Sequence, residues 1–267
     1  MSEPAHGDAG DGTALPGHLR SLQPTSQFAG DDGSADPQLA ALLAGYAKGI
    51  TPLRDVVARL AAARVLVPVL AELEVADAVA HPSGAEGQEL HVDKEASSGV
   101  VALEAPDGRR ALPVFTSVES MRAWRASARP VPVEAARAAL SAVGEDWSLL
   151  VVDPAGPVPV TVPRPAVWAL AQGRAWEPAL VPTADGIVVD GEVLAAVRLA
   201  AEPVQHVVRV DAQPGRTAEV AVVLTLDAGL DRAGLQAVLS QVNARLGASS
   251  VIADRVDSLE LRVGAAH

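Results

Sequence analysis

The sequence contains no cysteine, which removes several kinds of chemistry at the outset. Without thiolates there is no disulfide framework, no cysteine metal site and no cysteine nucleophile. Aromatic residues are also scarce: the 267 residues include two Phe and one Tyr, although 49% are apolar. The core is therefore expected to consist mainly of Val, Leu and Ala. A chain of this length suits one large domain or two modest ones.

Basic residues are fewer than acidic ones, with 21 Lys and Arg against 33 Asp and Glu. The net charge is −12, and residues 1–36, 37–180 and 181–267 are each acidic overall. Nucleic acids and anionic membrane surfaces are therefore not expected as partners. The longest apolar runs, such as VLVPVLA at 65–71, are far shorter than the ~20 residues of a membrane-spanning helix. Residues 1–36 show no secretory signal pattern, so the expected location is the cytoplasm.

Composition and periodicity divide the chain into four parts. Residues 1–36 are rich in Gly, Asp, Ser and Pro and are predicted to form a disordered acidic tail. A first domain is expected over 37–180, a linker over 181–191 and a second domain over 192–267.

The first domain is predicted to be a mixed sheet with flanking helices. Thr51 is the expected N-cap of the second helix, and Pro68 favours an edge or bulged position for the first strand. Turn signals at 106–108 and 154–157 predict two hairpins. The expected helices are 37–49, 51–63, 117–128, 133–143 and 163–173, and the expected strands are 64–72, 98–105, 109–115, 148–153 and 158–162.

The second domain is predicted to be a small ββαβ plait. Its expected elements are strands at 203–210 and 218–226, a helix at 230–247 and a strand at 256–264. Residues 193–200, which precede them, suit a helix or a strand, and the helix is favoured. Asp231 is the predicted N-cap of the long helix, and Leu259, Leu261 and Val263 are predicted to face inward. The non-alternating order of elements assigns the whole chain to the α+β class.

The stretch ALPVFTSVESMRAW, at 111–124, joins a predicted strand to a predicted helix. Thr116 and Glu119 have the spacing of a capping box. A catalytic role for Ser117 is the alternative, but the G-x-S-x-G motif is absent and no His is near in sequence. The hydroxyl groups are therefore interpreted as structural.

Five arginines form the local concentration of positive charge. Arg122, Arg125 and Arg129 would share one face of the predicted helix, and Arg109 and Arg110 are near in sequence. This cluster is a candidate site for an anionic ligand or an acidic protein segment, including the acidic tail of the chain itself. The alternative is a solvated basic face paired with scattered glutamates.

The remaining polar residues give weaker signals. Glu89, His91, Asp93 and Glu95 would share one face of a strand, a pattern that suits a half-exposed strand better than a metal site. His206 lies on an apolar strand pattern, and Asp153 is predicted to form a turn. No nucleotide-binding or zinc-protease motif is present, so no metal and no cofactor is predicted.

Two segments resemble a known family. RRALPVFTSVESMRAW (109–124) and SLLVVDPAGPVPVTVPRPAVWALAQG (148–173) are similar to the characteristic blocks of the SseB family, the enhanced serine sensitivity proteins. Asp153-Pro154 stands where that family commonly has Asn-Pro. The resemblance covers roughly 37–180, and the end of the chain is similar to the C-terminal SseB domain in element order and length. The many arginines and few lysines suit an actinobacterial member.

The resemblance implies a link to serine tolerance, but it brings no catalytic residues and no cofactor. We therefore expect a non-enzymatic binding or regulatory protein that acts through protein contacts, with a homo-oligomer as a candidate state. Two alternatives stay open. One is an enzyme whose site forms between the domains and includes His91 or His206. The other is a secretion-associated accessory protein, which a family label suggests.

Overall fold

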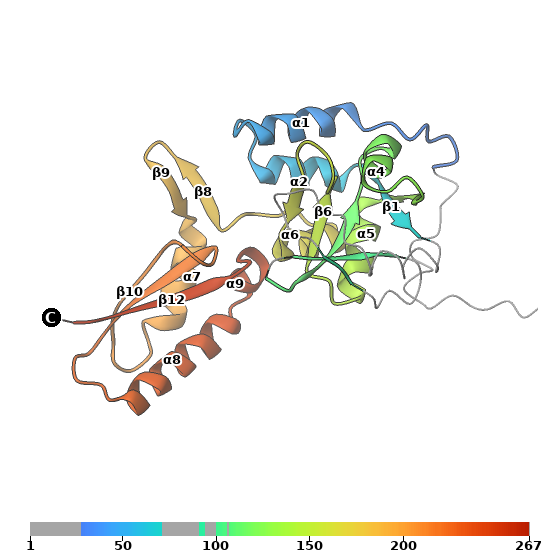
Figure 1. The fold of residues 1–267 in the computed structure, drawn as a ribbon. Coiled ribbons are helices and arrows are strands. Elements are labelled where there is room, and N and C mark those ends of the chain that lie inside the picture. The colour runs from blue at the N-terminus through green and yellow to red at the C-terminus, as the bar shows by residue number, and fades with distance from the viewer. Residues whose placement is uncertain (1–27, 71–90, 94–99, 106, 267) are drawn as a thin grey trace, which may run out of the picture.

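The computed structural model describes residues 28–70, 91–93, 100–105 and 107–266, with backbone only for 91–93. Its N-terminal part combines helices with a mixed sheet, and its C-terminal part is a smaller helix-covered sheet (Figure 1). The helices of the N-terminal part are α1 (Pro37–Ala47), α2 (Leu53–Ala61), α4 (Val118–Trp124), α5 (Ala135–Gly144) and α6 (Arg164–Ala171). Its strands are β1 (Arg64–Val69), β2 (His91–Asp93), β3 (Ala102–Glu104), β4 (Arg110–Val114), β5 (Arg129–Glu134), β6 (Leu149–Val152) and β7 (Val160–Val162).

The main N-terminal sheet has the strand order β2-β3-β4-β6-β7. Both predicted hairpins are present, since β3 pairs antiparallel with β4 and β6 pairs antiparallel with β7. The pairing of β4 with β6 is parallel, and α4, β5 and α5 make the connection between these two strands. The α+β class predicted from the sequence is therefore confirmed.

Strand β1 pairs with β5 in a separate antiparallel sheet of two strands. Leu66 and Phe115 exchange backbone hydrogen bonds, N to O, of 2.8 and 2.9 Å, which join this small sheet to the end of β4. Pro68 lies opposite Pro130 in the small sheet. The edge position predicted for a proline-containing strand fits this two-stranded arrangement.

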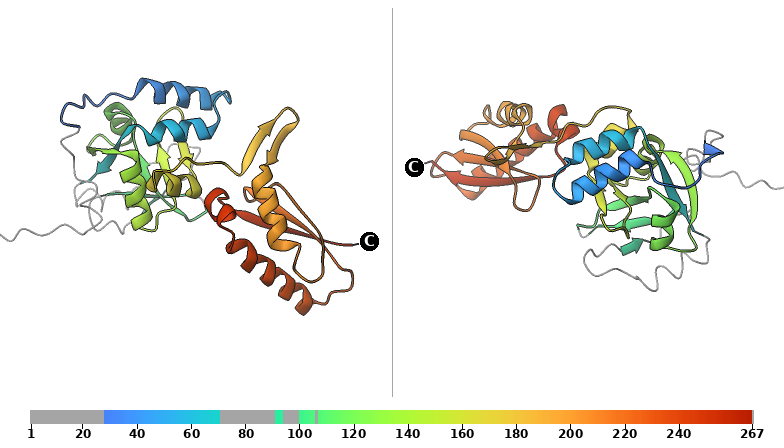
Figure 2. Two further views of the ribbon diagram at one scale, coloured as in Figure 1. Left: turned by 180° about the vertical axis from the view of Figure 1, so that it is seen from behind. Right: turned by 90° about the horizontal axis from the view of Figure 1, so that it is seen from above.

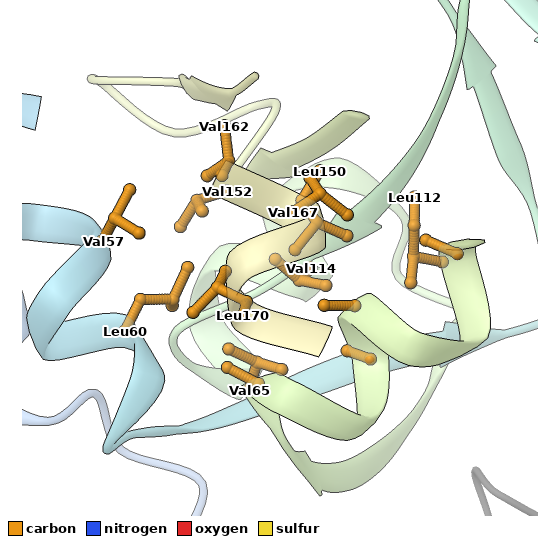
Figure 3. Packing of buried hydrophobic residues seen from close by; sticks show 14 of the residues in the cluster. Val57, Leu60, Val65, Leu112, Val114, Leu150, Val152, Val162, Val167 and Leu170 are labelled. Carbon is orange, nitrogen blue, oxygen red and sulfur yellow. The ribbon is translucent and has the colours of Figure 1, made fainter. Parts of the chain in front are cut away.

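The N-terminal core lies between the sheet and the helices. Val57 and Leu60 of α2 face Val152, Val162 and Leu170, which belong to β6, β7 and α6 (Figure 3). All five side chains are buried, and most of the core is Val, Leu and Ala, as the composition predicted. Helices α5 and α6 pack closely because their contact faces carry small alanines such as Ala138, Ala139 and Ala166.

Two N-terminal boundaries differ from the predictions. Pro52, not Thr51, is the N-cap residue of α2, and no side chain caps this helix end. The helix predicted at 117–128 ends at Trp124. Residues 129–134 form strand β5, which was not predicted and which takes the first two residues of the helix predicted at 133–143. The sequence RPVPVE has alternating valines and two prolines, so it suits an edge strand and not a continuing helix.

The C-terminal part begins with a hairpin where the sequence predicted a linker. Residues 181–191 are mostly β8 (Leu180–Thr183) and β9 (Gly186–Val189), joined through Gly186 at φ 128°. The remaining elements are α7 (Gly191–Ala201), β10 (Val207–Pro214), β11 (Val220–Leu226), α8 (Arg232–Gly247), α9 (Ser250–Arg255) and β12 (Leu259–Ala265).

The C-terminal sheet has the order β10-β11-β12, with β10 antiparallel and β12 parallel to β11. Helices α7 and α8 cover one face, where Val197, Val242 and Leu246 meet Val222 and Leu224. Asp231 caps α8 as predicted, with its carboxylate accepting from the Gly234 amide at 2.7 Å. The short helix α9 was not predicted.

Candidate functional site

The ends of the parallel strands β4 and β6 form a buried polar junction. Thr116 follows β4 and Asp153 follows β6. The Asp153 carboxylate accepts from the Thr116 amide at 2.9 Å, the Thr116 hydroxyl at 2.7 Å and the Ser120 hydroxyl at 2.6 Å. Asp153 also turns the chain at φ 48°, a left-handed conformation that Asp adopts more readily than most residues. The predicted turn residue therefore also ties α4 to the sheet.

The cap of α4 differs from the predicted one by one residue. Ser117 is the N-cap and accepts from the Ser120 amide at 3.0 Å, while the Ser120 hydroxyl completes the capping box. Thr116 is directed to Asp153 instead. The Thr116–Glu119 box was therefore wrong, because a buried carboxylate competes for the Thr hydroxyl. All three hydroxyl groups have structural partners within this junction.

The five candidate arginines do not form one surface. Arg122 lies in the last turn of α4, Arg125 is the C-cap residue and Arg129 begins β5. The common helix face predicted for these three arginines was wrong, since the helix ends before Arg129. Arg125 lies over the Trp124 ring, with its guanidinium carbon 5.2 Å from the ring centroid. Arg110 is in β4 and has its own partner in the structure.

Arg109 pairs with two aspartates of the chain, Asp257 and Asp107. Its Nη1 donates to both carboxylate oxygens of Asp257 at 2.9 Å, and its Nε donates to Asp107 at 2.7 Å. Asp257 lies in the C-terminal part, just after α9, and its side chain is 13% exposed. The same carboxylate accepts from the Arg164 amide, at the first residue of α6, at 3.1 Å. We call these contacts of Asp257 with Arg109 and Arg164 the Asp257 clamp.

Glu219, just before β11, holds the backbone of Asp257. Its Oε2 accepts from the Asp257 amide at 2.6 Å. Burial raises the pKa of Glu219, the hydrogen bond from the Asp257 amide opposes that rise, and the nearby Asp257 charge adds to it. Two carboxylates thus lie together at this junction, and Arg109 pairs with one of them, Asp257.

Helix α9 places the clamp by packing against α6, as Figure 1 and the left view of Figure 2 show. Arg255, at the end of α9, donates to the Glu177 and Pro178 carbonyls at 3.2 and 2.9 Å. Its Nη1 also pairs with Asp190 and Glu192 at 2.9 Å. The crossing segment before β8 and the start of α7 are therefore held to the same short helix.

A groove on the C-terminal part lies between α7 and the junction of α8 with α9. Its volume is about 610 Å³, and its apolar wall includes Ala196, Leu199 and Val251. Leu199 is 75% exposed, so its side chain is accessible to a second molecule. Arg245 stands at the groove and donates from Nε to the Ala200 carbonyl at 2.6 Å. The groove lining also contains an acidic residue, Glu192, which is paired with Arg255.

The other candidate groups do not join a site in the part of the chain that the structure describes. His206 precedes β10 at φ 71° and pairs through Nδ1 with Asp227 at 3.1 Å, so its predicted position in a strand was wrong. The metal hypothesis rested on Glu89, His91, Asp93 and Glu95, whose side chains lie outside the described residues. Among the described residues, no three His, Asp or Glu side chains are grouped to hold a metal ion.

These observations define an α+β protein whose two parts are joined by an acid–arginine clamp, with an apolar groove on the second part. Comparison with known proteins supplies the family. Residues 39–169 match the family model described as SseB protein N-terminal domain, and this match places the chain in the SseB family. No curated protein and no solved structure was found to match the chain. Among the helices described, none is long and apolar enough to cross a membrane.

Proposed function

We propose that this member of the SseB family is a non-enzymatic protein-binding protein that acts through contacts with other proteins. The groove between α7 and the α8–α9 junction carries the proposal, because it presents an exposed leucine over an alanine-rich wall. Apolar side chains in a groove with a polar rim are typical of sites that receive a protein segment.

The charges at the groove indicate the kind of segment. Glu192 pairs with Arg255, which Asp190 also contacts, while the terminal nitrogens of Arg245 have no partner among the described residues. The groove is therefore complementary to an apolar segment that carries an acidic side chain. A helix with a narrow apolar stripe fits this description, since small alanines allow close approach of a second helix.

The test uses Leu199→Glu with Ile187→Glu as its matched control. Both side chains are exposed and aliphatic, but Ile187 lies in the β8–β9 hairpin, away from the lining of the groove. Each purified full-length variant is immobilised and incubated with extract of the native cells, and retained proteins are quantified. A partner retained by wild type and Ile187→Glu, and lost from Leu199→Glu, is the expected result. Identical sets on all three proteins would refute the groove as the binding site.

The physiological part of the proposal is a role in serine tolerance, which the family resemblance suggests. A strain without the protein is expected to grow abnormally on excess serine, and the wild-type chain should restore its growth. Leu199→Glu should fail to restore growth if the same groove serves this role. Unchanged growth of the deletion strain would separate the binding function from serine tolerance.

A further inference from the structure

The two edges of the C-terminal sheet differ in how they are protected. At one edge, β9 lies beside β10, and β10 itself has an irregularity between Val207 and Arg209. At the other edge, β12 runs without a bulge along β11 and contains no proline. In the part of the chain that the structure describes, no strand pairs with the outer side of β12. Natural sheets usually protect such an edge, so an open regular strand indicates a pairing surface.

The hydrogen-bond pattern shows which backbone groups are available. Ser258 accepts from the Val220 amide at one end of β12, and the Ala266 amide donates to Leu226 at the other. In a parallel ladder, alternate residues bond to the neighbouring strand. The backbone groups of Glu260, Arg262 and Gly264 therefore face β11. Those of Leu259, Leu261 and Val263 point away from the sheet, toward the open edge.

The side chains of β12 make this edge complementary to itself. If two copies of β12 pair antiparallel with Leu261 opposite Leu261, Glu260 of each copy faces Arg262 of the other. On the opposite face, Leu259 of each copy faces Val263 of the other, and Val263 is 45% exposed in the single chain. Opposite charges and apolar side chains thus meet their counterparts in one register. Within one chain, Arg262 Nε donates to Glu260 at 2.8 Å, so both side chains already lie on the same face. The Glu260 carboxylate also accepts from the Arg216 amide at 3.1 Å and the Thr217 amide at 2.9 Å, which fixes its position beside the edge.

We propose that the chain forms a two-fold dimer by antiparallel pairing of β12 with β12 of a second copy, which makes one continuous six-stranded sheet. The hydrogen bonds come from Leu259, Leu261 and Val263, and the register is set by the Glu260–Arg262 pairs. This surface is separate from the groove of the proposed function, because no residue of β12 lines that groove.

The first experiment is sedimentation of the full chain over a concentration series up to about 100 µM. We expect a concentration-dependent dimer. Val263→Pro removes an amide that faces the edge and leaves the ladder to β11 in place, so it should raise the dimer dissociation constant at least about tenfold. Its circular dichroism and Tm show whether the chain still folds. A monomeric wild type, or a Val263→Pro variant that dimerises as wild type does, would overturn the proposal.

A charge-reversal pair tests the register. Arg262→Glu places Glu opposite Glu260 of the second copy, and Glu260→Arg places Arg opposite Arg262, so each variant alone should be monomeric. Mixed together, the two variants should form a heterodimer, because every facing pair is then opposite in charge. Native mass spectrometry distinguishes the species. Absence of the heterodimer, with wild-type dimers present and both variants folded, would refute this register.

Amide exchange measured by NMR gives an independent readout in the wild-type protein. The Leu261 and Val263 amides should be protected in the dimer and exchange rapidly on dilution. The Arg262 amide, which bonds to β11, should stay protected in both states and serves as the internal control. Leu261 and Val263 amides that exchange rapidly in the dimer would place the dimer contact elsewhere.

Discussion

Arg109 and Asp257 are 148 residues apart in the chain, and the guanidinium of one donates to both carboxylate oxygens of the other at 2.9 Å. Arg109 lies in the turn between β3 and β4, and Asp257 lies between α9 and β12. Because Asp257 also accepts from the first amide of α6, a single carboxylate connects two N-terminal elements to the C-terminal sheet. The Arg109–Asp257 pair therefore joins the N-terminal part of the chain to the C-terminal part.

Arg109→Gln should loosen the connection between the two parts. A charge-assisted hydrogen bond typically contributes about 1.5–3 kcal/mol, and this one is partly buried. We expect earlier proteolysis between α6 and β8 and a lower urea midpoint. The matched control is Arg174→Gln, because Arg174 pairs with Asp254 at 3.5 Å and both side chains are about half exposed. Arg174→Gln should lower the free energy of unfolding by less than about 1 kcal/mol. Equal effects of the two substitutions would contradict a special role for the clamp.

Glu219→Gln should stabilise the protein at neutral pH. The pKa of Glu219 is raised in the folded state, so the protonated form is favoured by folding. Protonated Glu219 therefore adds to the free energy of unfolding. This stabilisation is complete below the pKa of the unfolded state, about 4.3, and is lost as the pH rises through the folded-state pKa. Glutamine removes the charge near Asp257, and its carbonyl oxygen can still accept from the Asp257 amide. We expect a Tm about 1–4 °C higher at pH 7.

The control for this prediction is the pH dependence of the difference. The Tm advantage of Glu219→Gln should shrink as the pH falls toward 4, where wild-type Glu219 becomes protonated. Glu219→Ala leaves the Asp257 amide without its acceptor and should be destabilising at both pH values. A constant difference between wild type and Glu219→Gln from pH 4 to pH 7 would contradict the assigned pKa shift.

Asp153→Asn should destabilise the N-terminal part by about 2 kcal/mol. The substitution keeps a side chain that tolerates the left-handed backbone, so its effect reports on the carboxylate and not on the turn. The carboxylate accepts three hydrogen bonds from Thr116 and Ser120, and an amide can accept fewer. Urea denaturation measures the change. Glu119→Gln is the control and should lie within about 0.5 kcal/mol of wild type, because Ser120 and not Glu119 occupies the capping box.

Leu60→Ala should be among the most destabilising single changes in the N-terminal core. Leu60 of α2 is fully buried, and Figure 3 shows it facing Leu170 and Val65. Loss of a buried leucine with a residual cavity costs about 2–5 kcal/mol. Ile50→Ala is the control, because Ile50 is exposed and should change the free energy of unfolding by less than about 0.5 kcal/mol. A small effect of Leu60→Ala would show that the core repacks.

Local patterns in the sequence predicted much of the fold. Both N-terminal hairpins, the helices α1, α6 and α7 and the capped helix α8 follow from turn residues, prolines and helical spacing. These features depend on residues close together in the chain, so one sequence is enough to read them. Val263 is an exception: it shares a strand face with Leu259 and Leu261, as predicted, but it remains 45% exposed.

The predicted arginine site shows where local pattern fails. Helical spacing grouped Arg122, Arg125 and Arg129, although Arg129 belongs to a strand that pairs with β1, where its partner Val69 lies 60 positions earlier in the chain. The cap of α4 failed for the same reason, because Asp153 comes from a distant strand and competes for the Thr116 hydroxyl. Arg109 pairs with Asp257, which follows α9, a helix of only six residues that the sequence did not predict.

The sequence by itself determined a cysteine-free, acidic α+β chain with a Val-, Leu- and Ala-rich core, and its marker segments pointed to the SseB family. These properties follow from composition and from short-range spacing. Only the tertiary structure decided which acids meet which cations, where the groove opens and which sheet edge is unpaired. Those outcomes depend on contacts between residues far apart in the chain, whose energies are set by burial and geometry that no local pattern contains.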